Sequence, residues 1–201
     1  MDSVHICFCL KSPMISPGTD ASLAACYHDV YKPAAKFLLK HPEFKMAFSF
    51  NGIVLSFLRK NYPEFIEILQ ELTARKQVEM LGGGYYDPAF PLLFPMDRTG
   101  QIELLSSEIR QTTKKRPRGL TVCASIWDAS LVTCFSTCGM EYILLDESLI
   151  PPEKTKFVPF IMSDKGKSLS IIPFYRGDKP LPENPALFLE KLAAEVKKDK
   201  S

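Results

Sequence analysis

The segment Gly-Gly-Gly-Tyr-Tyr-Asp-Pro at residues 82–88 carries the most informative side chains of this sequence, and it directly follows a short, mostly apolar run at residues 78–81. Glycines at a strand exit let the backbone turn where side chains would clash, and let it approach a ligand closely. Aromatic faces cover the C–H surface of a sugar ring, and carboxylates accept hydrogen bonds from its hydroxyls. The segment therefore predicts a sugar-binding loop, with a tight loop whose tyrosines lie in the core as the alternative.

Further polar and aromatic side chains follow the other predicted strands. Lys11 follows the first strand, Asn51 the second, residues 125–128 the fourth, and Asp146 with Glu147 the fifth. Ligands of α/β sheets and barrels gather outside the carboxyl ends of the strands, so we expect these groups to face one site. The candidate ligand-binding residues are Lys11, Tyr85, Tyr86, Asp87, Trp127, Asp128 and Asp146.

Some of these candidates have a plain structural alternative. Trp127, the only tryptophan, is either a stacking platform at a pocket wall or a core residue whose N–H needs a partner, and we favour the platform. Asp146 and Glu147 can instead cap the turn that follows the fifth strand. A lysine at the start of a loop, such as Lys11, is often only solvated.

The elements that must position these residues alternate along the chain. Strands are predicted at residues 4–10, 45–50, 77–81, 120–123 and 141–145. Helices are predicted at residues 20–40, 53–59, 64–75, 97–113 and 130–137, with Pro33 as a kink, Asp97 as a cap and Gly139 as a stop. The first run alternates too little for a surface strand, so we expect it to be buried. Such alternation indicates parallel strands with crossover helices, hence a doubly wound sheet or a barrel.

The pattern changes after Pro151-Pro152. Residues 157–162 and 168–173, joined by Asp-Lys-Gly-Lys at residues 164–167, are predicted to form a β-hairpin. Residues 182–198 are predicted to form a final helix.

Composition bounds the class of protein. With 201 residues, 46% of them hydrophobic, the chain can bury one sizeable core, and we expect a single domain over residues 1–201. The 25 basic and 23 acidic residues leave a net charge of +2, which speaks against a nucleic-acid or membrane-surface partner. Neither a membrane-spanning run nor a secretory signal is recognisable, so we expect a cytoplasmic protein.

The six cysteines are expected to be reduced thiols, mostly buried, because they sit mainly inside apolar segments. Cys7 and Cys9 would share one face of a strand, and Cys134 and Cys138 one face of a helix. Neither pair has zinc-site spacing with a histidine beside it. We therefore predict no metal site and no cofactor.

The sequence resembles the N-terminal part of the catalytic barrel of glycoside hydrolase family 57, the α-amylase and 4-α-glucanotransferase group that acts on α-glucans with retention. The resemblance implies a parallel (β/α)7-type barrel. Because we count five strand–helix units plus a hairpin, we expect an α/β fold with an incomplete or distorted barrel of this type, ending in a β-hairpin and a helix. The matching segments are Phe50-Asn51, residues 77–88, Asp97-Arg98 with Gln101-Ile102, residues 127–131, residues 139–142 and Leu145-Asp146.

Departures from the family pattern bear directly on activity. The family segment A-E-R-x-W-E-P, whose first glutamate is the nucleophile, falls on residues 123–129 and places Ala124 at the nucleophile. The family's H-Q-P appears as Lys11-Ser12-Pro13, with Cys9 where an earlier histidine is usual. The family's acid/base aspartate lies further along than Ser201. Retaining hydrolysis needs two carboxyl groups about 5 Å apart, so the resemblance implies that the catalytic pair is not in place.

The leading hypothesis is a catalytically degenerate amylase-like protein that binds α-glucan or a related carbohydrate without hydrolysing it. Tyr85, Tyr86 and Trp127 would stack on sugar rings, while Asp87, Asp128 and Asp146 would accept hydrogen bonds from hydroxyls. Lys11 would contact a hydroxyl or an anionic group. The alternatives are an active hydrolase or glucanotransferase of this family, and a structural or interaction protein whose cleft is closed by side chains.

The count of strands also bears on assembly. A bare sheet edge invites pairing, so we expect it to be covered either by another copy of the chain or by a missing C-terminal part of a longer polypeptide.

Overall fold

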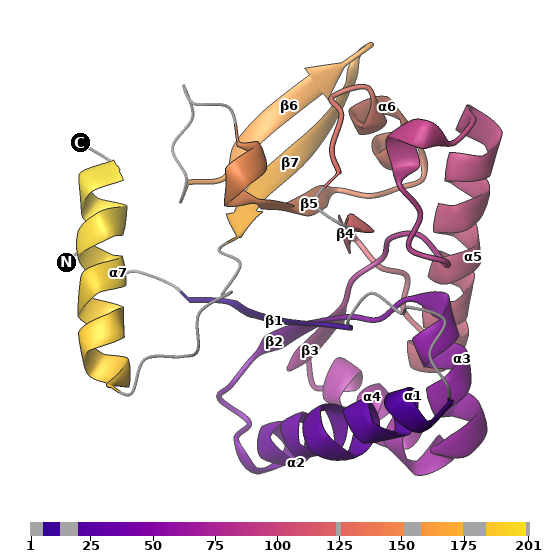
Figure 1. The fold of residues 1–201 in the computed structure, drawn as a ribbon, viewed down its shortest axis with the longest axis vertical. Helices are drawn as coiled ribbons and strands as arrows, with labels where there is room; N and C mark the ends of the chain where they lie inside the picture. The colour runs from indigo at the N-terminus through magenta and orange to yellow at the C-terminus, as the bar shows by residue number, and fades with distance from the viewer. Residues whose placement is uncertain (1–5, 13–19, 124–125, 151–157, 175–183, 200–201) are drawn as a thin grey trace.

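The strands form two sheets in the computed structural model of the chain (Figure 1). The structure describes residues 6–12, 20–123, 126–150, 158–174 and 184–199. The first sheet has the strand order β1-β2-β3, and the second has the order β4-β5-β7-β6. All neighbours are parallel except β6 and β7, which are antiparallel. The strands are β1 (Phe8–Lys11), β2 (Met46–Ser49), β3 (Val78–Met80), β4 (Gly119–Thr121), β5 (Tyr142–Asp146), β6 (Phe160–Asp164) and β7 (Lys167–Phe174).

Gly82 joins the two sheets. Its N–H donates to Gly119 O at 2.8 Å, and its carbonyl accepts from the Thr121 N–H at 3.1 Å, as in a parallel ladder. The strands therefore follow one another from β1 to β7 as a single curved parallel layer. This arrangement confirms the predicted incomplete parallel barrel, and the strand order leaves β1 at an edge, with one strand neighbour among the described residues.

Helices of the first half cover one face of the first sheet (Figure 1). Their apolar side chains meet those of β2 and β3 in a first core, which includes Phe48, Phe50, Phe65 and Leu69. The elements are α1 (Asp20–Cys26), the π-helical turn η1 (Tyr27–Tyr31), α2 (Lys32–Lys40), α3 (Gly52–Asn61) and α4 (Pro63–Ala74).

The helical stretch predicted at residues 20–40 contains a π-helical turn where a proline kink was expected. The Lys32 N–H donates to Tyr27 O, five residues back, immediately before Pro33. Because proline has no N–H, a change of hydrogen-bond register at this point leaves fewer carbonyls without a partner. The turn also directs Tyr27 and Tyr31 into the core, where both are buried.

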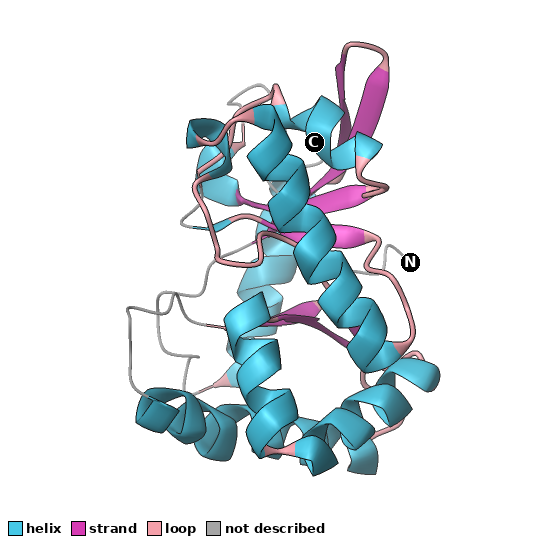
Figure 2. Cartoon of the chain, turned by 90° about the vertical axis from the view of Figure 1, so that its right-hand side faces the viewer, coloured by secondary structure: helices cyan, strands magenta, loops and turns pink. Residues whose placement is uncertain are grey.

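Helix α5 (Pro95–Thr113) connects the two halves of the molecule. Ile102 belongs to the second core, while Leu105 and Ile109 belong to the first. Figure 2 shows this helix, on the right in Figure 1, running across both halves. The predicted cap at Asp97 is wrong: the helix begins at Pro95, after an extended Phe94, because proline is pre-set for a first helical turn.

The second half packs α6 (Leu131–Thr137) against β7 around a second core that includes Leu120, Phe135, Ile143 and Ile171. The predicted hairpin is confirmed: β6 and β7 pair, and Lys165 and Gly166 turn between them with φ of 49° and 75°. Short 3₁₀ turns, η2 (Phe90–Leu92) and η4 (Glu147–Leu149), follow β3 and β5.

The last helix, α7 (Pro185–Asp199), lies beyond the start of β1, apart from the other helices (Figure 1). Residues 182 and 183, where the helix was predicted to begin, lie outside the described residues. Within the described part of the chain, no helix combines the length and apolar character needed to cross a membrane.

Strand β1 is more exposed than predicted. Ile6 and Phe8 are 40% and 44% exposed, and Cys7 and Cys9 are exposed as well, so the expected buried strand and buried thiols are wrong here. Only Leu10 packs against the first core. An edge strand has a neighbour on one side only, which the local apolar pattern does not reveal. Cys123 and Cys138 are buried as expected.

Candidate functional site

Side chains of β2 and β4 meet although β3 runs between them. Ser49 Oγ and Thr121 Oγ1 are 2.8 Å apart, and both residues are buried. The chain between them leaves β3 at Gly82 and Gly83, which carry no side chains to separate the hydroxyls. A Cβ added at Gly83, where φ is 155°, would lie only 2.9 Å from Thr121 O. The glycines therefore let the sheet curve tightly at the level of the strand ends.

Lys11, at the end of the edge strand β1, reaches across to the segment that follows β4. Its Nζ donates to Val122 O at 2.7 Å, which links the end of β1 to the segment that leaves β4. Burial raises the pKa of Asp87 and of the Cys123 thiol, and the Lys11 charge opposes both rises. Lys11 is thus a partner within the site, beyond the merely solvated lysine considered from the sequence.

Asp87 and Asn51 form the polar centre of this region. Asn51 Nδ2 donates to Asp87 Oδ2 at 2.7 Å, while Asn51 Oδ1 accepts from the Val54 N–H at 2.9 Å and caps α3. Burial raises the pKa of Asp87, and the Asn51 hydrogen bond and the Lys11 charge oppose that rise. Burial and the Asp87 charge raise the pKa of Cys123, which keeps this thiol protonated at neutral pH.

We call Lys11, Asn51, Asp87 and Cys123 the strand-end cluster. Lys11 and Asp87 were among the residues selected from the sequence. Asn51 was noticed after the second strand but not selected, although Asn-Gly before a helical pattern is a cap signal. Ser49 and Thr121 were missed, and nothing in the local sequence distinguishes them from other polar residues of a strand.

The two tyrosines of the glycine loop have different surroundings. Tyr85 is half-buried: its hydroxyl is 2.9 Å from Ser56 Oγ, and a Cβ at Gly52 would overlap its ring. Tyr86 is 61% exposed, and its N–H donates to Gln101 Oε1 at 2.9 Å. Their ring centroids are 4.8 Å apart at an interplanar angle of 68°. Tyr86 therefore presents the more open aromatic surface.

Trp127 is half-buried and packs against the second core, with its ring 6.1 Å from that of Phe135. Residues 124 and 125 lie outside the described residues, and with them the predicted substitution site Ala124. Ile126 N donates to Cys123 O at 3.1 Å, so the chain returns to the end of β4 before Trp127.

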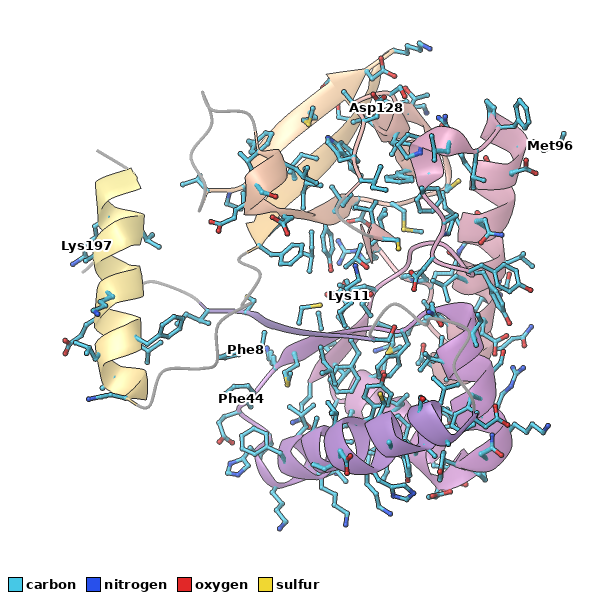
Figure 3. All side chains as sticks on the ribbon, in the orientation of Figure 1. Phe8, Lys11, Phe44, Met96, Asp128 and Lys197 are labelled. Atoms are coloured by element: carbon cyan, nitrogen blue, oxygen red, sulfur yellow. The ribbon has the colours of Figure 1, made fainter. Side chains whose placement is uncertain are left out.

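The remaining acidic candidates are engaged locally. Asp128 is exposed, and its Oδ1 accepts from the Ser130 N–H at 2.9 Å, which lowers its pKa. Figure 3 shows Asp128 in the upper half of the molecule, apart from Lys11. Asp146 is buried at the end of β5, and its Oδ1 accepts from Ser148 N at 2.9 Å and from Ser148 Oγ at 2.6 Å. Asp146 thus has the capping contacts that the sequence offered as its alternative role.

Two other features lie away from this site. A shallow hollow of about 410 Å³ lies between the start of α1 and the end of α3, and none of the strand-end residues lines it. Among the residues that the structure describes, histidine, cysteine, aspartate and glutamate side chains form no group of three or more suited to a metal ion.

The strand order, the helices that cover the sheet and the polar groups at the strand ends define a protein of the (β/α)-barrel class. Within that class the chain belongs to glycosyl hydrolase family 57, whose family model matches residues 4–184. It is 30% identical, over 89% of its length, to Alpha-amylase 1 of Dictyoglomus thermophilum. It is 27% identical, over 75% of its length, to a 4-alpha-glucanotransferase of Thermococcus kodakarensis.

The structure of the 4-alpha-glucanotransferase from Thermococcus litoralis superimposes with a TM-score of 0.80 at 25% identity, covering 93% of this chain. The relatives are much longer: this chain spans 27% of the Dictyoglomus protein, 24% of the Thermococcus kodakarensis protein and 31% of the superimposed structure. The chain is therefore amylase-like in sequence and fold over the part that it shares with these proteins.

Proposed function

We propose that the chain binds an α-glucan at the strand-end cluster without hydrolysing it. The proposal rests on Ala124, which we align with the nucleophilic glutamate of the family pattern. A methyl group cannot form a glycosyl ester, and retaining hydrolysis needs two carboxyl groups about 5 Å apart. Loss of such a nucleophile removes several powers of ten in rate, or roughly 8 kcal/mol of barrier lowering.

The surroundings of Asp128 and Asp87 support the proposal that neither carboxylate replaces the nucleophile. Asp128 is four residues beyond Ala124 in sequence, but it is exposed and holds the turn at Ser130. Asp87 is held by Asn51 and lies near the Lys11 charge, a setting that suits hydrogen bonds to a neutral ligand.

Binding would use the groups at the strand ends in complementary ways. The exposed ring of Tyr86 would stack on a sugar face, with Tyr85 and Trp127 forming the wall beside it. Asp87 would accept hydrogen bonds from hydroxyls, and Lys11 would donate to them. Asp128 and Asp146 already accept hydrogen bonds from Ser130 and Ser148, so we expect them to contribute less.

The test is a pair of measurements on the wild-type chain. Calorimetric titration with maltoheptaose should give weak saturable binding, with Kd of about 1 mM. Reducing-sugar release from amylose should stay at the level of a protein-free control. The variant Tyr86→Ala should weaken binding several-fold, whereas Ile161→Ala, which removes a 70% exposed side chain on β6, should not. A titration without heat for any α-glucan would remove the binding half of the proposal.

The second candidate is an active hydrolase or glucanotransferase, which the names of the relatives favour. Sugar release by the wild type that Asp128→Asn abolishes would establish this alternative and overturn the first. A third candidate is an interaction protein with a closed cleft, which the packing of Tyr85 on Gly52 and Ser56 favours. Binding of maltoheptaose that Tyr86→Ala weakens would exclude it.

A further inference from the structure

The connection between β3 and α5 exposes large apolar side chains to an unusual degree. Leu92 is 84% exposed, Phe94 79% and Met96 83%. Exposed apolar residues are common singly, but a group of them on one short segment marks an interaction site. Tyr86, 61% exposed, belongs to the same connection. We call Tyr86, Leu92, Phe94 and Met96 the apolar ridge.

The backbone beneath the apolar ridge is held in place. Arg98 donates from Nε to Leu93 O at 2.9 Å and from Nη2 to Pro91 O at 3.0 Å. Phe90, only 1% exposed, anchors the same segment in the second core. The prolines at positions 88, 91 and 95 further limit its backbone freedom. The exposure of the ridge is therefore built into the fold and does not come from a loose loop tip.

The two parts of the ridge are anchored to neighbouring turns of one helix. Gln101 accepts from the Tyr86 N–H, and Arg98, three residues earlier on α5, holds Pro91 and Leu93. Residues three apart on a helix lie on the same face, about 5–6 Å from each other. Tyr86 and the segment before α5 are thus anchored to the same face of this helix, and Figure 3 shows Met96 at its upper end.

The chemistry of the ridge favours a neutral ligand over a second protein. Residues 85–96 contain a single charged side chain, Asp87, and no basic one. A stable protein interface uses about 20–30 residues on each side, far more than this ridge offers. The ridge begins at Tyr86, next to Asp87 of the strand-end cluster, so a long ligand bound at the cluster would reach it. Aromatic rings and methyl groups suit the C–H faces of successive sugar residues.

We propose that the apolar ridge binds the part of an α-glucan chain that extends beyond the strand-end cluster. This inference rests on the proposed function, because it takes the same ligand. It adds that affinity rises with chain length, since only a long glucan covers both the cluster and the ridge. Short oligosaccharides are held by the cluster alone and do not sense Leu92, Phe94 or Met96.

The experiment is calorimetric titration of the wild type and two variants with maltotriose and maltoheptaose. The double variant Leu92→Ser/Phe94→Ser removes the ridge, and Ile161→Ser, a matched change of a 70% exposed side chain on β6, is the control. Maltotriose should bind all three proteins equally. Maltoheptaose should bind the wild type and the control about tenfold more tightly than the double variant. If the double variant fails to fold, Met96→Ser replaces it, since that side chain is equally exposed.

Three other outcomes would overturn the proposal that the apolar ridge binds the glucan chain. Equal affinity of wild type and double variant for maltoheptaose would overturn the ridge proposal and leave glucan binding at the cluster intact. A wild type that binds neither sugar would overturn the proposed function as well. A wild-type dimer in light scattering that the double variant dissolves would identify a second copy of the chain as the occupant, and would overturn the ridge proposal.

Discussion

Asp87 and Asp128 both follow predicted strands, yet their surroundings shift their pKa values in opposite directions. Burial near the end of β3 raises the pKa of Asp87. Hydrogen bonds from Ser130 lower that of the exposed Asp128. A carboxyl whose pKa rises on folding prefers its neutral form in the native state, and one whose pKa falls prefers its charged form. The two residues therefore affect the pH dependence of stability with opposite signs.

Comparison of Asp87→Asn with the wild type should show this effect of burial. As pH rises from about 3 to about 6, ionisation of Asp87 should destabilise the wild type relative to the variant, because the folded pKa lies above the unfolded one. Urea unfolding at a series of pH values measures the difference. A difference that does not change over this window would contradict the buried setting of Asp87.

The matched variant Asp128→Asn should change the profile with the reverse sign. The charged form of Asp128 stabilises the fold above the unfolded pKa, and this stabilisation is lost as pH falls through the lower folded pKa. The wild type should therefore lose stability relative to Asp128→Asn only at the acid end of the series. The same direction of change for both variants would mean that the surroundings of one carboxylate are wrongly assigned.

At the scale of elements, a glycine of α3 and a glycine of α5 differ in the space available for a side chain. Gly52 opens α3, and a Cβ there would overlap the ring of Tyr85. Gly100 lies within α5, and a Cβ there would meet nothing within 4 Å. The first glycine is needed because the tyrosine approaches the helix closely, while the second has no such contact.

We therefore expect opposite effects of adding a methyl group to the two helices. Gly52→Ala should displace Tyr85 from Ser56 and destabilise the fold by about 1–3 kcal/mol. Gly100→Ala should stabilise α5 by about 0.5–1 kcal/mol, because alanine restricts the unfolded chain and favours helix. Denaturant unfolding of the two variants measures both values. A neutral Gly52→Ala would show that the tyrosine ring is free to move away.

At the scale of the whole molecule, β1 is the exposed margin of an open sheet. It has a strand neighbour on one side among the described residues, and Ile6 and Phe8 add apolar surface beside it. Natural edge strands commonly carry charges that prevent pairing. Residues 6–10 carry none, and the one charge of β1, on Lys11, is hydrogen-bonded to Val122 O. The edge is therefore available for pairing, either with a second copy or with a further part of a longer polypeptide, the two possibilities that the sequence raised.

Self-association through this edge predicts a mass above 22.7 kDa in light scattering, increasing with protein concentration. Ile6→Lys should return the mass to that of the monomer, because a lysine at the edge opposes strand pairing. Ile161→Lys is the control, since Ile161 is exposed on β6 rather than on β1. A wild type that stays monomeric at all concentrations would argue against pairing between copies.

Most secondary structure was predictable because it depends on neighbours in sequence. Pro63 stands in the first turn of α4, Gly139 takes φ of 81° after α6, and Lys165-Gly166 turns the hairpin. These features express backbone preferences that each residue carries with it. The misses, the π-helical turn before Pro33 and the start of α5, arose where packing or a competing terminal residue decided the outcome.

By itself, the sequence determined the alternation of strands and helices and the glycine loop after β3, because both are local properties of the chain. Only the tertiary structure decided that Lys11 reaches Val122, that Ser49 meets Thr121 across the glycine gap, that Tyr85 is enclosed while Tyr86 is open, and that β1 is exposed. These contacts depend on how strongly the sheet curves and where it stops. Curvature and edges arise from all the strands together, so no short segment records them.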